Sequence, residues 1–114
     1  MNDDITSKGV IKNLLERIKT GVVSTINKDG NPESSLVYYV TDESFNIYFA
    51  TYSNSRKYPN IVAHKMVAFN VSDTVDPQTI QIEGIAEDMK ISGQHAILER
   101  LNNVHSSNTA YFPP

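Results

Sequence analysis

The hydrophobic positions of the chain recur with two different spacings, and each spacing predicts its own kind of element. Short β-branched or aromatic runs bounded by turn residues predict five strands, over residues 21–26, 36–40, 46–51, 66–71 and 79–87. The last run is the clearest, because Ile80 and Ile82 alternate there with Gln81 and Glu83. Helical spacing predicts a helix over residues 8–18, with Ser7 as its candidate cap, a short helix at 61–63 and a helix over residues 94–104.

The segments between the predicted strands are short and rich in turn residues. Residues 27–32 contain Asp-Gly, which supports a hairpin, and Pro32 is unsuited to a continuing central strand. Tight turns join antiparallel strands, whereas parallel strands need long crossovers. The pattern therefore predicts a mainly β fold, an antiparallel β-barrel with flanking helices, formed as one domain over residues 1–114. Gly84 interrupts the last strand and is expected at a bulge or a close backbone contact.

Composition and charge exclude several classes of protein. No run approaches the 18 or so apolar residues of a membrane span, and the N-terminus does not read as a secretory signal. The net charge of −3 argues against binding to nucleic acid or to an anionic membrane surface. The sequence has no cysteine, which fits a reducing compartment, so a cytoplasmic location is expected. His64, His95 and His105 share no metal-ligand spacing, and no metal site is expected.

One stretch concentrates positive charge and hydroxyl groups. Residues 49–61 read FATYSNSRKYPNI, with Arg56 and Lys57 adjacent to each other and close to several hydroxyl side chains. Pro59 is tolerated only in the first turn of a helix, so a helix is expected to begin near residues 58–59. Hydroxyls, cations and a helix start could together bind a phosphate. The alternative is that this stretch is a solvated helix start.

The same stretch belongs to a longer pattern that resembles a known family. Residues 30–73 combine a Gly-x-Pro turn, an apolar strand, an acidic turn, a strand ending in Thr51, and then Ser-Arg-Lys and Asn-Ile. A later strand ends in Glu-Gly at residues 83–84. This order resembles the FMN-binding split-barrel family of pyridoxamine 5′-phosphate oxidase and its smaller relatives, over residues 10–88. The resemblance implies a six-stranded antiparallel split barrel that forms a homodimer, with FMN sites at the interface that the partner completes.

The resemblance also implies roles for individual residues. In such proteins the positions of Thr51, Arg56 and Lys57 hold the FMN phosphate, and the strand from Ser35 to Tyr38 offers its backbone to the isoalloxazine ring. A polar residue that opens the later strand, here Thr79, reaches the flavin or its ribityl chain. The full implied set is Ser35, Leu36, Val37, Tyr38, Ala50, Thr51, Ser55, Arg56, Lys57 and Thr79.

Three departures from the larger oxidases limit what the resemblance implies. Ser35 and Val40 stand where those oxidases carry an arginine and a lysine, and Thr79 stands where they carry a glutamine. The chain also ends at residues 111–114, where a further strand and a substrate-recognising segment would be expected. Oxidation of pyridoxamine phosphate is therefore not expected.

Two functions remain open at this point. The first is an FMN-dependent oxidoreductase that acts on a small substrate. The second is a non-enzymatic dimeric barrel that holds a flavin or another ligand. No catalytic residue can be named, which suits a flavoprotein because the cofactor performs the redox step.

Overall fold

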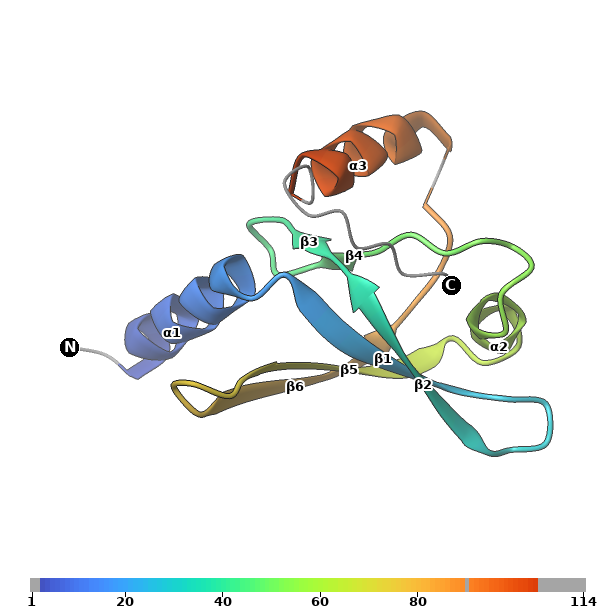
Figure 1. Cartoon of the computed structure of the whole chain (residues 1–114), viewed down its shortest axis with the longest axis horizontal. Coiled ribbons are helices and arrows are strands. Elements are labelled where there is room, and N and C mark those ends of the chain that lie inside the picture. Colours follow the sequence, from blue (N-terminus) through green and yellow to red (C-terminus); the bar gives the residue numbers. More distant parts are fainter. Residues whose placement is uncertain (1–2, 90, 105–114) are drawn as a thin grey trace.

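Four strands form one antiparallel sheet in the computed structural model, which describes residues 3–89 and 91–104 (Figure 1). They are β1 (Thr20–Ile26), β2 (Pro32–Tyr38), β5 (Met66–Asp73) and β6 (Gln78–Ile85), in the spatial order β2-β1-β5-β6. The short strands β3 (Val40–Thr41) and β4 (Ile47–Tyr48) pair with each other in a second antiparallel ladder. The predicted mainly β, antiparallel split-barrel fold is confirmed, and β2 and β6 are the two edges of the four-stranded sheet.

Three helices flank the strands (Figure 1). α1 (Asp3–Arg17) packs on β5 and β3, α2 (Lys57–Ala63) packs on β1, and α3 (Ile91–Val104) packs on β3. α1 begins four residues before Ser7, so the prediction that Ser7 caps the helix was wrong. None of the helices in the described ranges combines the length and the apolar character needed to cross a bilayer.

The strand boundaries differ most from the predicted ones in two strands, and the predicted strand 36–40 is divided between β2 and β3. β2 begins at Pro32 rather than at residue 36, because the first position of an edge strand does not need the N–H that proline lacks. The predicted strand 46–51 is reduced to the two residues of β4. Beyond it the hydroxyls of Thr51 and Ser55 bond to each other, 2.7 Å apart, and the chain turns toward α2.

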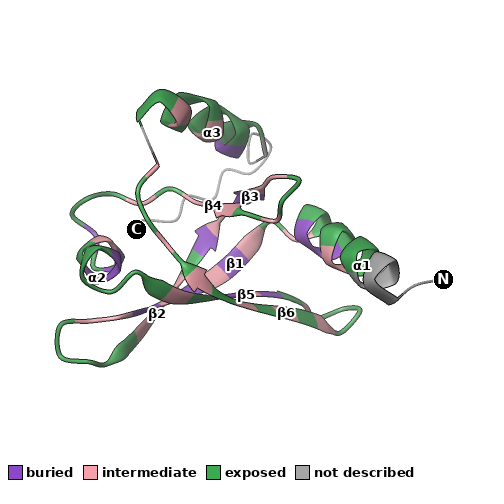
Figure 2. Ribbon diagram, turned by 180° about the vertical axis from the view of Figure 1, so that it is seen from behind, coloured by how far each residue is buried: buried purple, intermediate pink, exposed green. Residues whose placement is uncertain are grey.

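The hydrophobic core lies between the inner face of the sheet and α1 (Figure 2). Its fully buried members are Leu14, Leu15, Val23, Val37, Tyr39, Phe69 and Val71. Tyr39 meets the ring of Phe69 edge-on at 5.5 Å. Its hydroxyl donates toward the carbonyls of Leu15 at 2.9 Å and Ile18 at 2.6 Å, which ties the end of α1 to the core. Burial raises the pKa of the Tyr39 phenol to about 12.

Close packing of a glycine occurs in β1 rather than in β6. Gly84 pairs in regular register with Val67, and a Cβ at Gly84 would meet no atom within 4 Å. The predicted bulge or close contact at Gly84 was therefore wrong. A Cβ at Gly21 would instead overlap the ring of Phe69, so the core packs against the bare backbone there.

Candidate functional site

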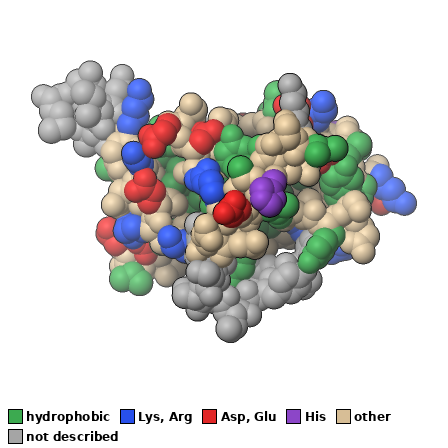
Figure 3. Space-filling model, turned by 90° about the horizontal axis from the view of Figure 1, so that it is seen from above, with side chains coloured by type: hydrophobic (Ala, Val, Ile, Leu, Met, Phe, Trp, Pro, Cys, Tyr) green, Lys and Arg blue, Asp and Glu red, His purple; other side chains and the backbone are tan. Residues whose placement is uncertain are grey.

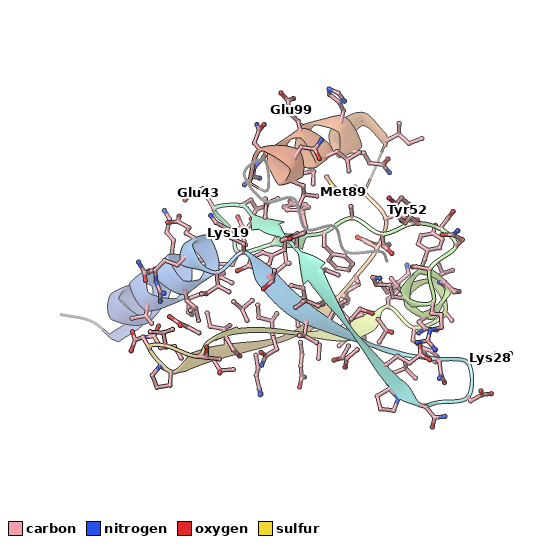
Figure 4. All side chains as sticks on the ribbon, viewed as in Figure 1. Lys19, Lys28, Glu43, Tyr52, Met89 and Glu99 are labelled. Atoms are coloured by element: carbon pink, nitrogen blue, oxygen red, sulfur yellow. The ribbon has the colours of Figure 1, made fainter. Side chains whose placement is uncertain are left out.

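The loop between β4 and α2 carries the hydroxyls of the predicted phosphate cluster. Its first residue is anchored in the core, because the ring of Phe49 stacks on Phe69 at a centroid distance of 6.3 Å. Thr51 then pairs with the buried Ser55, and the oxygen of Ser55 also accepts the N–H of Tyr58 at 3.4 Å. The loop thus folds back onto the start of α2. Figure 4 labels Tyr52 in this loop, on the side of the molecule where α2 lies.

Lys57, the first residue of α2, is buried. Only 4% of its surface is exposed, and this burial lowers the pKa of its ammonium. Within the described part of the chain, the ammonium has neither a hydrogen-bond acceptor nor a carboxylate within ion-pair distance. Removing a charged group from water without compensation is costly. An anion bound beside Lys57 would supply the missing compensation.

Arg56 differs from its neighbour in being exposed. Its side chain is 88% exposed, and one guanidinium nitrogen lies 3.9 Å from a carboxylate oxygen of Glu33 on β2. α2 begins at Lys57, one residue earlier than predicted, and Arg56 occupies its N-cap position without a side-chain cap. Because the guanidinium is exposed and its contact with Glu33 is long, it can turn toward a ligand at little cost.

Glu33 is fixed by a network that sequence reasoning missed. Asn27 donates to one of its oxygens at 3.1 Å, and Asn60 donates to the other at 2.9 Å. The Asn60 amide also donates to Thr25 at 3.0 Å, and both of these side chains are buried. Hydrogen bonds from Asn27 and Asn60, aided by the charge of Arg56, hold the pKa of Glu33 below its usual value.

This network links α2 to the β1–β2 hairpin. The one signal in the sequence that could have indicated the role of Glu33 is strand alternation. Glu33 alternates with Ser34 and so faces the same inner side of β2 as Ser35 and Val37. A carboxylate at an inward position of a strand needs partners.

Two further parts of the predicted site lie on opposite edges of the sheet. The residues from Ser35 to Tyr38 lie on β2, which in the described part of the chain pairs with β1 alone, so the sheet does not use the other side of this strand. Thr79 lies on β6, where its hydroxyl is 3.1 Å from that of Ser72. β1 and β5 separate the two edges, a distance of about 14 Å at the usual strand spacing. A single chain therefore does not bring Thr79 to the loop between Thr51 and Lys57.

A cavity of about 350 Å³ lies elsewhere, between α1, the β3–β4 turn and α3. It contains none of the predicted site residues. Its charged lining residues are Lys12, Lys19, Arg100, Glu16, Asp42 and Glu43, and their charges cancel. Figure 3 shows the same mixing of basic and acidic side chains over the upper face of the molecule. The cavity has no excess positive charge that would favour an anion.

The histidines do not add a metal site to this picture. His64 and His95 are exposed, and His105 lies outside the described residues. Among the residues that the structure describes, no three His, Asp or Glu side chains gather as metal ligands would. The loop and the start of α2 carry two hydroxyls, of Thr51 and Ser55, and two cations, Arg56 and Lys57, which are groups that suit a phosphate.

Comparison with known proteins identified one family. The family model described as pyridoxamine 5′-phosphate oxidase matches residues 7–108. No curated protein shows significant similarity to the sequence.

Several solved structures share the fold. An F420 reductase superposes with a TM-score of 0.72 at 28% identity, over 90% of this chain and 81% of its own. General stress protein 26 from Bacillus anthracis superposes with a TM-score of 0.72 at 27% identity, over 88% of this chain and 74% of its own. An FAD-binding protein from Mesorhizobium loti shares only 18% identity, with a TM-score of 0.70 over 90% of this chain and 75% of its own.

Proposed function

Because the chain belongs to the pyridoxamine 5′-phosphate oxidase family, we propose that it is a flavoprotein that binds FMN through the loop from Thr51 to Lys57. The observation that carries this proposal is the burial of the Lys57 ammonium without a partner in the described chain. A phosphate placed beside it would compensate that charge and could also accept from the hydroxyls of Thr51 and Ser55, which already lie together.

The energetic balance favours a charged phosphate over a neutral ligand. A phosphate monoester carries about −1.5 to −2 charges at neutral pH. Each charge-assisted hydrogen bond contributes on the order of 1.5–3 kcal/mol, so Lys57 and Arg56 together could supply most of the affinity. Arg56 would have to leave Glu33, but that contact is long and exposed, so little is lost.

The flavin ring is proposed to lie along β2, against the backbone from Ser35 to Tyr38. In the described part of the chain the sheet does not use this edge, so the N–H and C=O groups of Ser35, Leu36 and Val37 that point away from β1 could meet the polar edge of the ring. Thr79 lies on the opposite edge and would reach a flavin only if a second chain supplied it. The proposal therefore includes a homodimer in which each FMN site is completed by the partner.

The outer face of the sheet supports such a dimer. Among its exposed positions, which also include polar residues, are Leu36, Met66 and Ile85, whose exposed fractions are 50%, 59% and 70%. Met66 and Ile85 are direct cross-strand neighbours, so their side chains form a continuous apolar surface. Apolar side chains that gather in this way are typical of an interface.

We further propose that the protein is an oxidoreductase acting on a small substrate. Bound FMN would supply the hydride or electron transfer, while the residues named above bind and orient it. The names of two relatives, F420 reductase and FAD-binding protein, support a flavin-like ligand. The competing function is a non-enzymatic dimeric barrel that holds a flavin or another ligand.

Fluorescence titration with FMN tests the binding site. Lys57→Ala and Arg56→Ala should each weaken FMN by about 2–3 kcal/mol or less, with Lys57 the larger effect because its charge is buried. Thr51→Val should weaken FMN less, since it removes a neutral hydroxyl. Lys65→Ala is the matched control, because Lys65 is exposed and outside the loop. Equal affinities in all variants would exclude this loop as the phosphate site.

Reduction of the bound flavin separates the two functions. If the protein is an oxidoreductase that uses a nicotinamide donor, NADH or NADPH should bleach the flavin absorbance of the reconstituted protein under anaerobic conditions. Unchanged absorbance with both donors would favour the binding protein.

A further inference from the structure

We propose that Glu33 sets the charge preference of the phosphate site, so that flavins with a phosphodiester are accepted nearly as well as the monoester FMN. This proposal rests on the function proposed above. It starts from a carboxylate beside one of the two cations: an oxygen of Glu33 lies 3.9 Å from a guanidinium nitrogen of Arg56.

Glu33 cannot easily turn away from the site. Its two oxygens are held by different amides, Asn27 at 3.1 Å and Asn60 at 2.9 Å, and its side chain is only 26% exposed. Asn60 is itself buried and bonded to Thr25, so the network is anchored in the sheet. The same hydrogen bonds keep the pKa of Glu33 low, which leaves the carboxylate ionised at neutral pH.

The charges of the cluster then add to a small net value. Arg56 and Lys57 contribute two positive charges and Glu33 one negative charge, which leaves one positive charge in total. A phosphodiester carries one negative charge and matches this value, whereas a monoester carries nearly two. The second charge of a monoester is attracted by the two cations but repelled by Glu33, so it adds little affinity.

A purely structural role of Glu33 would give a different signature. The network also ties α2 to the β1–β2 hairpin, so loss of Glu33 could loosen the whole site. Loosening would weaken all flavins together. A charge effect instead changes the affinity ratio between two ligands that differ by one charge.

The experiment compares three ligands: riboflavin, FMN and the monomethyl ester of FMN, in which one phosphate oxygen carries a methyl group. The protein is titrated as wild type, as Glu33→Gln and as Glu43→Gln. Glu43 is the matched control, because it is paired with Lys12 at the distant β3–β4 turn. In the wild type, FMN should bind less than about fivefold more tightly than the methyl ester.

In Glu33→Gln the preference for FMN over the methyl ester should increase by about tenfold, because a unit charge near the phosphate is gone. In Glu43→Gln the preference should stay at the wild-type value. An unchanged preference in Glu33→Gln would overturn the proposal. A wild-type preference for FMN above about fivefold would also overturn it, and this can be measured even if the variant fails to fold. If riboflavin binds the wild type as tightly as FMN, the phosphate site itself is refuted and this proposal with it.

Discussion

Replacement of Lys57 by methionine should make the ligand-free protein more stable. Methionine has a similar length and helix propensity, so the substitution removes the buried charge and little else. An unsatisfied buried polar group costs about 1–3 kcal/mol, and more when it is charged. With 4% of Lys57 exposed and no partner in the described chain, most of that cost should be recovered. We expect a gain of about 1–3 kcal/mol, or roughly 4 °C in Tm for each kcal/mol.

The pH dependence of the free energy of unfolding is a second test of the buried charge of Lys57. Burial lowers the pKa of Lys57 from 10.5, so the unfolded chain keeps its proton at pH values where the folded chain has lost it. The stability of the wild type should therefore rise with pH between the lowered pKa and 10.5. Lys57→Met should lack this rise.

Urea denaturation of ligand-free wild type, Lys57→Met and the exposed control Lys65→Met measures both effects. Lys65→Met should stay within about 0.5 kcal/mol of the wild type. FMN at 100 times the wild-type Kd should then narrow this difference by about 2 kcal/mol, because it stabilises the wild type by about 2.7 kcal/mol and the more weakly binding variant by much less. Destabilisation of the ligand-free protein by Lys57→Met would refute the reasoning, since it would mean that Lys57 stabilises the fold itself.

Three further predictions concern the scaffold. Gly21→Ala should cost about 1–3 kcal/mol of stability because its methyl group would overlap Phe69, whereas Gly84→Ala should be neutral or stabilising by up to about 1 kcal/mol. A similar loss of stability in both variants would contradict the packing described. Tyr39→Phe should cost about 1–2 kcal/mol by leaving the carbonyls of Leu15 and Ile18 without their donor, and an unchanged urea midpoint would contradict this. Hydrogen bonds from Asn46 and Tyr48 lower the pKa of Asp42 to about 2. The ionised Asp42 therefore stabilises the folded protein above pH 3.8, its ordinary pKa, and this stabilisation is lost as the pH falls toward 2. The stability difference between wild type and Asp42→Asn should close over that range.

The sequence predicted those features that depend on local patterns. A short apolar run located β5, the alternation of Ile80 and Ile82 located β6, and Pro59 placed the start of α2 within two residues. The extent of β2 was underestimated, because a proline is compatible with a strand only at an edge, and the edge is defined by the fold. In the same way, the sequence indicated a cationic loop but not that Lys57 is buried while Arg56 is exposed.

Tertiary partners explain the remaining differences. Glu33 and Asn60 are 27 residues apart, and their hydrogen bond depends on how α2 packs against the β1–β2 hairpin. Nothing in the local sequence of either residue specifies the other. Thr79 shows the opposite case, because the family resemblance assigns it to the flavin whereas the single chain holds it at the far edge of the sheet.

The affinity of the wild-type protein for FMN relative to riboflavin tests the central claim most directly. The two ligands differ only in the phosphate, and one charge-assisted partner of a desolvated anion contributes about 2–3 kcal/mol. Fluorescence titration of the wild type should therefore show FMN binding at least roughly 30-fold more tightly than riboflavin. Equal affinities for the two flavins, or no binding of either, would contradict the assignment of the loop from Thr51 to Lys57 as a phosphate site.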